Sequence, residues 1–164
     1  VVDRLKTIPI IRIWLQESGI ASGLIGSYVV DVLMKDYSVI NKTYSKGWLE
    51  VESILKKMEE VNDNIVVVII PTREQVDSSR MSKAANQLGY KIQDVDIYKP
   101  SRIIRKYCQN LSILCIDLLP EFINMQEQGE QLYFEIDPHF NKEGNVLASE
   151  IIHRKIIQVI DLSK

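Results

Sequence analysis

The chain has few of the residues that mark disulfide-bonded, metal-binding or membrane-spanning proteins. It contains only two cysteines among 164 residues, Cys108 and Cys115, and no Cys-x-x-Cys pair. Two cysteines are too few for a disulfide scaffold, and because both lie among apolar residues we interpret them as small buried hydrophobes. No apolar run approaches the ~20 residues that a membrane-spanning helix needs, and no signal peptide is visible. The sequence therefore indicates no membrane segment, metal or cofactor, and it leaves the cellular compartment open.

The chain also lacks a bias in charge. It has 20 basic and 22 acidic residues, for a formal net charge of -2. This balance argues against nucleic acid as a main partner, since binding phosphates needs a concentrated basic face. The local cluster of Arg102, Arg105 and Lys106 is typical of a solvated helix face. Length and composition fit one soluble domain over residues 1–164, and the start at Val1 instead of methionine suggests a segment of a longer protein, hence an incomplete domain.

Two segments predict buried strands. Residues 65–70 are an unbroken β-branched run, and residues 112–118 are apolar apart from Ser112 and Asp117. Strands without an apolar–polar alternation are typical of the centre of a parallel sheet that helices cover on both faces. A proline, Pro71 or Pro120, is expected to close each strand. Strands that alternate with helices predict an α/β fold, with three α/β/α layers and a parallel sheet.

The helices are expected where apolar residues recur at three-and-four spacing. Residues 36–46 are polar and are expected to form a loop, whereas residues 1–17 fit a short helix or a strand equally well. Ser22 is a plausible N-cap of the first helix. The predicted helices cover residues 22–35, 48–61, 81–88, a segment that begins at Pro100, 121–126 and 142–160.

Asp137 and His139 form the candidate site, with Pro138 between them. In extended backbone, two residues at this spacing point to the same side and lie roughly 7 Å apart. The carboxylate can then accept a hydrogen bond from one imidazole nitrogen, which fixes the tautomer and lets the other nitrogen take a proton. Pro138 restricts the backbone between them. The spacing therefore suits the acid/base arm of a serine-hydrolase site.

Other roles for this pair stay open. Asn141 is a good N-cap, with Glu143 in the first turn of the final helix, so Asp137 and His139 could serve only to cap that helix. A metal site lacks a third ligand at a defined spacing. The second histidine, His153, falls inside the last predicted helix, and we interpret it as structural.

The order of these elements resembles the C-terminal half of the SGNH (GDSL-like) hydrolase superfamily. It is nearest to the branch with Asp-x-His-Trp/Phe-Asn, which includes acetyltransferase-like proteins that act on polysaccharides. The resemblance covers about residues 47–160 and is sharpest over residues 132–148. It implies that Asp137 and His139 are the catalytic aspartate and histidine. The segment 71–76, at the carboxyl end of a predicted strand where open α/β sheets bind ligands, is a weaker match.

The chain departs from this family in what should precede the resemblance. The Gly-Asp-Ser nucleophile, the oxyanion-hole glycine and the Gly-x-Asn-Asp block are all missing. Ser18, Ser22 and Ser27 are poor substitutes, because too few residues separate them from the strand at 65–70 for the family's intervening strands. A serine supplied upstream of Val1 explains the pattern better.

We therefore expect the Asp–His arm of an ester hydrolase or O-acyltransferase, inactive alone, whose parent protein acts on an acyl ester or an acetylated carbohydrate. The alternative is a non-catalytic α/β binding domain that keeps the hydrolase framework. A flavodoxin-like or receiver-like module fits the alternation of strands and helices, but the sequence has no phosphate loop or acidic cluster. Exposed strand edges would favour self-association.

Overall fold

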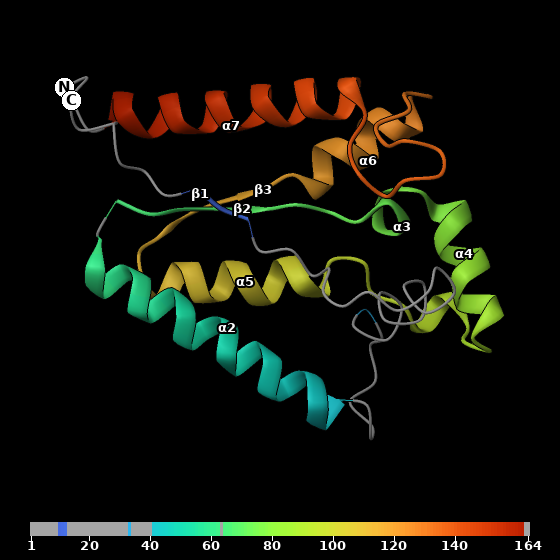
Figure 1. The fold of residues 1–164 in the computed structure, drawn as a ribbon, viewed down its shortest axis with the longest axis horizontal. Helices are drawn as coiled ribbons and strands as arrows, with labels where there is room; N and C mark the ends of the chain where they lie inside the picture. The colour runs from blue at the N-terminus through green and yellow to red at the C-terminus, as the bar shows by residue number, and fades with distance from the viewer. Residues whose placement is uncertain (1–9, 13–32, 34–40, 63, 163–164) are drawn as a thin grey trace.

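The structure is a computed structural model, and it describes residues 10–12, 33, 41–62 and 64–162. Helices and short strands alternate along these residues (Figure 1), which confirms the predicted α/β class. The predicted helix at 22–35, apart from Leu33, and the serines Ser18, Ser22 and Ser27 lie outside the described residues. The elements are β1 (Ile10–Arg12), α2 (Asn41–Val61), β2 (Val66–Ile69), α3 (Arg73–Val76), α4 (Ser78–Gln87), the 3₁₀ helix η2 (Ile92–Asp94), α5 (Lys99–Asn110), β3 (Leu114–Asp117), α6 (Leu119–Glu127) and α7 (Lys142–Leu162).

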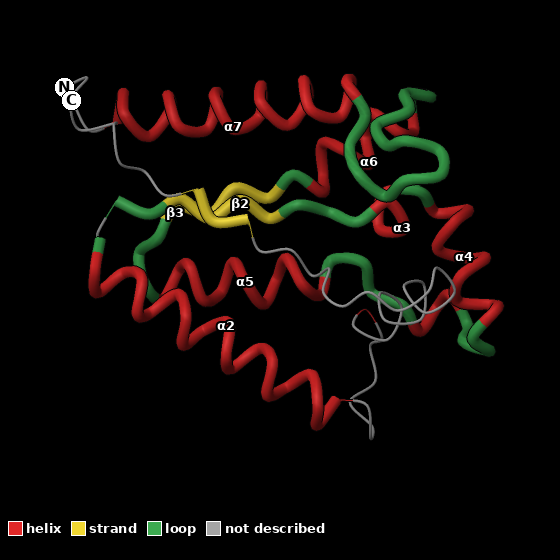
Figure 2. Tube along the Cα trace, in the orientation of Figure 1, coloured by secondary structure: helices red, strands yellow, loops and turns green. Residues whose placement is uncertain are grey.

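The three strands form one parallel sheet in the order β1-β2-β3, shown in yellow in Figure 2. Val66 of the central strand is the register partner of both Ile10 and Leu114. All four residues of β2 are buried, as its unbroken β-branched sequence predicted. β2 ends just before Ile70 and Pro71, so the proline follows the strand as expected.

The side chains of β2 alternate between two apolar clusters, one on each face of the sheet. Val66 and Val68 pack with Phe122 of α6 and Ile151 of α7. The second cluster holds the side chains that point the other way, namely Val67 and Ile69 with Leu55 of α2 and Ile104 and Cys108 of α5. Figure 1 shows the same division, with α6 and α7 on one side of the strands and α2 and α5 on the other. Because side chains alternate across a strand, these helices on both sides bury both faces of β2.

Several sequence-based boundaries were wrong. The helix predicted at 81–88 begins at Ser78, and the strand predicted at 112–118 is limited to Leu114–Asp117. The loop expected at 36–46 is helical from Asn41, since α2 extends two turns beyond its first apolar position. Helical hydrogen bonds form without an apolar stripe. The spacing of apolar residues therefore does not predict the first turns of a helix when these are polar. Pro120, expected to close β3, instead lies in the first turn of α6, where its missing N–H is not needed.

The carboxyl ends of β2 and β3 lead directly into short helices. The backbone N–H of Leu118, after β3, donates to the carbonyl of Ile69 at 3.1 Å. Thr72 caps α3 through a reciprocal capping box with Gln75. In Figure 1, α3 and α4 lie beyond these strand ends, where parallel sheets place their ligand sites. None of the helices in the described ranges is long and apolar enough to cross a membrane.

Candidate functional site

The segment that contains Asp137 and His139 folds back on itself between α6 and α7. Tyr133 and Phe140 form an antiparallel bridge. Flanking backbone bonds extend it, from Phe134 N–H to the carbonyl of His139 at 3.1 Å and from Asn141 N–H to the carbonyl of Leu132 at 3.1 Å. We call residues 132–133 and 140–141 the stem of this loop, and residues 134–139 its tip.

The stem is held by an aromatic cluster. The rings of Phe122 and Phe140 have centroids 4.7 Å apart, and Tyr133 meets Phe140 edge-on at 5.1 Å. The Tyr133 hydroxyl donates to the carbonyl of Pro71 at 2.8 Å, and burial raises the pKa of this phenol. The stem is therefore fixed to Pro71, just beyond the end of β2, which brings the loop to the carboxyl end of that strand.

The stem also joins the start of α7. Asn141 is the N-cap that the sequence predicted, since its Oδ1 accepts the N–H of Gly144 at 2.9 Å. Its Nδ2 donates to the carbonyl of Gln131 at 2.6 Å. At Gly144 a Cβ atom would lie 2.1 Å from the carbonyl oxygen of Leu132, so the close approach of α7 to the stem excludes any side chain there. Since Asn141 caps the helix, Asp137 and His139 are not needed for that purpose.

In the tip, the structure pairs Asp137 with His139. Asp137 Oδ1 makes a short hydrogen bond with Nδ1 of His139 and also accepts the backbone N–H of His139 at 2.8 Å. The backbone here is a bend and not the extended segment that the spacing suggested. The carboxylate reaches the ring because the bend brings the two residues together. A proton on Nδ1 leaves Nε2 as the basic nitrogen of the imidazole.

Both side chains of the pair face solvent. The exposed fraction is 56% for Asp137 and 54% for His139. The backbone N–H of His139, followed by its ring and by the positive charge of Arg73, lowers the pKa of the Asp137 carboxyl below its ordinary value. Asp137 is therefore ionised at neutral pH and can stabilise a positive charge that develops on the imidazole.

Arg73 is the residue of this site that the sequence did not single out. It opens α3, and its Nη1 donates to the carbonyls of Glu135 at 2.9 Å and Phe134 at 3.3 Å. Its Nη2 lies 3.5 Å from a carboxylate oxygen of Glu74. The strand-end position of residues 72–76 was predicted, but no local pattern indicates that an arginine there reaches a loop 61 residues further along the chain.

The neighbouring residues of α3 have structural roles. The amide of Gln75 is buried; its Oε1 accepts Thr72 N–H at 3.0 Å and its Nε2 donates to the carbonyl of Ile97 at 2.7 Å. These bonds fix α3 against the segment that precedes α5. The backbone at Arg73 is consequently held in a fixed position.

The other candidate residues lie away from the tip. His153 is exposed on α7. Cys108 is buried in the cluster around β2, and Cys115 is half-buried and packs against the same cluster; both are free cysteines. In the part of the chain that the structure describes, no group of three or more histidine, cysteine or acidic residues could hold a metal ion.

Comparison with known proteins gives no relative for this chain. No protein-family model, no curated protein and no solved structure matches it significantly. The geometry of Asp137, His139 and Arg73 therefore stands as the basis for any statement about function.

Proposed function

We propose that this chain supplies the Asp–His arm of a Ser-His-Asp triad in an SGNH-type ester hydrolase or O-acyltransferase. The observation on which this rests is the pairing of Asp137 Oδ1 with His139 Nδ1 on a loop fixed at the carboxyl end of a parallel strand. The helices on both faces of the sheet are compatible with the three-layer α/β/α arrangement of that superfamily. The order of strands and helices along the sequence, which resembles that superfamily, ends in this loop and in α7.

The chemistry assigned to the pair is general acid–base catalysis. Nε2 of His139 takes the proton of a serine hydroxyl as the serine oxygen attacks an acyl carbonyl, and the imidazolium then gives that proton to the departing alcohol. In the second half of the reaction, His139 takes the proton of water or of a sugar hydroxyl as its oxygen attacks the acyl-serine. The imidazolium returns this proton to the serine oxygen as the acyl–serine bond breaks. Asp137 holds the imidazole and stabilises its charged form. The substrate is an acyl ester or an acetylated carbohydrate, and the serine comes from outside the described residues.

The test is hydrolysis of p-nitrophenyl acetate by the longest natural protein that contains this chain. We expect His139→Ala to lower kcat by roughly a thousandfold or more, and Asp137→Asn to lower it strongly as well. His153→Ala is the matched control, since it removes the exposed histidine of α7 and should leave the rate unchanged. Equal rates for the parent protein and its His139→Ala variant would overturn the proposal.

One observation favours a non-catalytic alternative. Asp137 Oδ1 accepts the backbone N–H of His139 as well as its ring, so the carboxylate also stabilises the bend of the tip. On this second proposal the chain is an α/β binding domain that keeps the hydrolase framework. A fluorophosphonate probe separates the two, because it labels an activated serine. Labelling that disappears in His139→Ala supports the enzyme, and its absence from the longest protein supports the binding domain.

The same framework leads us to propose self-association. β3 is at the edge of the described sheet and pairs with β2 on one side only. An edge strand of this kind can pair with a second copy of the chain. Sedimentation velocity should show a dimer whose population rises with concentration, and a monomer at all concentrations contradicts this expectation.

A further inference from the structure

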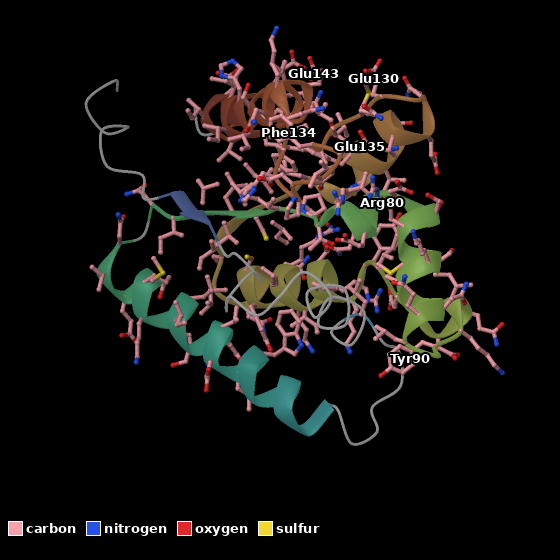
Figure 3. All side chains as sticks on the ribbon, turned by 45° about the vertical axis from the view of Figure 1, so that its right-hand side comes forward. Arg80, Tyr90, Glu130, Phe134, Glu135 and Glu143 are labelled. Atoms are coloured by element: carbon pink, nitrogen blue, oxygen red, sulfur yellow. The ribbon has the colours of Figure 1, made fainter. Side chains whose placement is uncertain are left out.

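The Arg73 guanidinium connects the end of β2 to the tip of the loop. It is only 16% exposed, and Nη1 is shared between two successive carbonyls, those of Phe134 and Glu135. Its Nε is buried and has no hydrogen-bond partner among the described residues, so the guanidinium is oriented chiefly by its contacts at the outer end. The permanently charged guanidinium suits this task, since its Nη1 carries two hydrogens and can donate to both backbone oxygens while Nη2 stays near Glu74. Figure 3 shows Phe134 and Glu135 between α7 and the helices at the strand end.

The charge of Arg73 acts on the same loop. Glu74 lies 3.5 Å from its Nη2 and balances part of its charge. Arg73 nevertheless contributes to lowering the pKa of the Asp137 carboxyl, after the larger effect of the hydrogen bonds from His139. Arg73 therefore contacts the backbone of the tip directly. It affects the Asp137 carboxylate electrostatically, through its positive charge.

We propose that Arg73 is the positioning residue of the Asp137–His139 pair, and that it aims the pair at the substrate by holding the Phe134 and Glu135 carbonyls over the end of β2. The inference rests on the proposed function, because a positioning role has a purpose only if the pair is catalytic. Arg73 makes no contact with a reacting atom in this scheme. Its effect reaches the chemistry through the place and orientation of the tip.

The first experiment measures the tip without any need for activity. NMR of the ¹⁵N- and ¹³C-labelled chain follows the side-chain carboxyl carbon of Asp137 during an acid titration, together with amide ¹H–¹⁵N heteronuclear NOEs of residues 134–139. The variants are Arg73→Gln, which removes charge and fork, and Arg73→Lys, which keeps the charge. Arg80→Gln is the matched control, because Arg80 is also an arginine in the first turn of a helix but pairs with Asp77, the N-cap of α4, at 3.3 Å.

Arg73→Gln should move the Asp137 titration midpoint upward, toward the ordinary value, and lower the NOEs of the tip amides. Arg73→Lys should keep part of the low midpoint but lose the order of the tip, whereas Arg80→Gln should change neither. If Arg73→Gln does not fold, Arg73→Lys decides alone through the NOEs. Unchanged NOEs in a folded Arg73 variant overturn the positioning role.

The second experiment measures kinetics in the longest natural protein. Arg73→Gln should lower kcat on the order of ten- to a hundredfold with KM nearly unchanged, since misplacement of a catalytic group by about 1 Å has effects of this size. A wild-type rate in Arg73→Gln overturns the inference while His139→Ala still lowers the rate. Equal rates for wild type and His139→Ala overturn the proposed function instead, and the NMR result then stands on its own as a statement about the loop.

Discussion

The two parts of the loop before α7 are built in opposite ways. The stem is largely buried, with Tyr133 packed against Phe140 and Phe122 and with its hydroxyl on the carbonyl of Pro71. The tip is exposed: Ile136 is 94% accessible, and the side chains of Asp137 and His139 are more than half accessible. The stem resembles the interior of the protein, and the tip resembles a surface that is free to meet another molecule.

This difference indicates that the stem determines where the loop lies, and that the tip carries the groups that can react. Buried aromatic contacts fix where the loop is, because close packing leaves few alternative arrangements. Exposed polar groups can change protonation state at little cost, which a buried group cannot do. We therefore expect changes in the stem to alter stability and changes in the tip to alter reactivity. Four substitutions test this division, from the largest expected effect to the smallest.

Phe122→Ala should have the largest effect. Phe122 is fully buried against Tyr133 and Phe140, so its removal leaves a cavity beside the stem. Losses of this kind lower the free energy of unfolding by about 3–5 kcal/mol. The measurement is urea unfolding followed by circular dichroism. Phe134→Ala in the tip is the matched control, since Phe134 is 53% exposed and should change stability by no more than about 0.5 kcal/mol. Similar losses for the two variants would contradict the division.

Gly144→Ala tests the contact between α7 and the stem. Its Cβ would lie 2.1 Å from the Leu132 carbonyl oxygen, so the helix or the stem must move. We expect a loss of about 1–3 kcal/mol, although alanine favours a helix over glycine by about 1 kcal/mol. Gly47→Ala in α2 is the control, because nothing lies within 4 Å of its Cβ position and the same change should stabilise the protein. A stabilised Gly144→Ala variant would show that the stem does not contact α7 this closely.

Asn141→Ala removes the cap of α7. The Oδ1 bond to Gly144 N–H and the Nδ2 bond to the Gln131 carbonyl are both lost. A cap of this type contributes about 1 kcal/mol, within a range of about 0.5–2 kcal/mol. Asn141→Asp separates the two bonds, because the aspartate keeps the acceptor but cannot donate to Gln131. Thermal unfolding should place Asn141→Asp between wild type and Asn141→Ala, and a variant as unstable as alanine would assign the effect to the Gln131 bond.

The sequence predicts the interior of this fold better than its boundaries. The β2 run was recognisable because four consecutive buried residues have no polar alternation. The start of α2 was missed because its first two turns are polar and contribute no periodic signal. Pro120 was assigned to the wrong element, since a proline between a strand and a helix is compatible with the end of one or the start of the other.

At the site, the sequence predicts what is close along the chain and misses what is distant. Asp137, His139 and the Asn141 cap are local patterns. All three residues make the interactions predicted for them, although Asp137 reaches His139 through a bend and not through extended backbone. Arg73 contacts a loop 61 residues away, and no spacing rule contains such a pairing. The sequence indicated only that α3 follows the end of a strand, where ligand sites are common. That position predicts a region of interest but does not identify Arg73 within it.

The smallest effect on stability belongs to Asp137→Asn. The folded protein holds the pKa of Asp137 below 3.8 through the His139 N–H, the imidazole and Arg73. A carboxyl with a depressed folded pKa contributes stability above its unfolded pKa and loses it as pH falls through the folded value. The wild type should therefore melt slightly above Asp137→Asn at pH 7, and the difference should vanish as pH falls from about 4 through the folded pKa.

Glu135→Gln is the control from the same tip, because no hydrogen bond or ion pair to its carboxylate is present among the described residues. In contrast, the loss in Phe122→Ala should persist over the whole of this pH range, since it comes from packing. A melting difference for Asp137→Asn that is large and independent of pH would place this residue with the stem and end the distinction between the two parts of the loop.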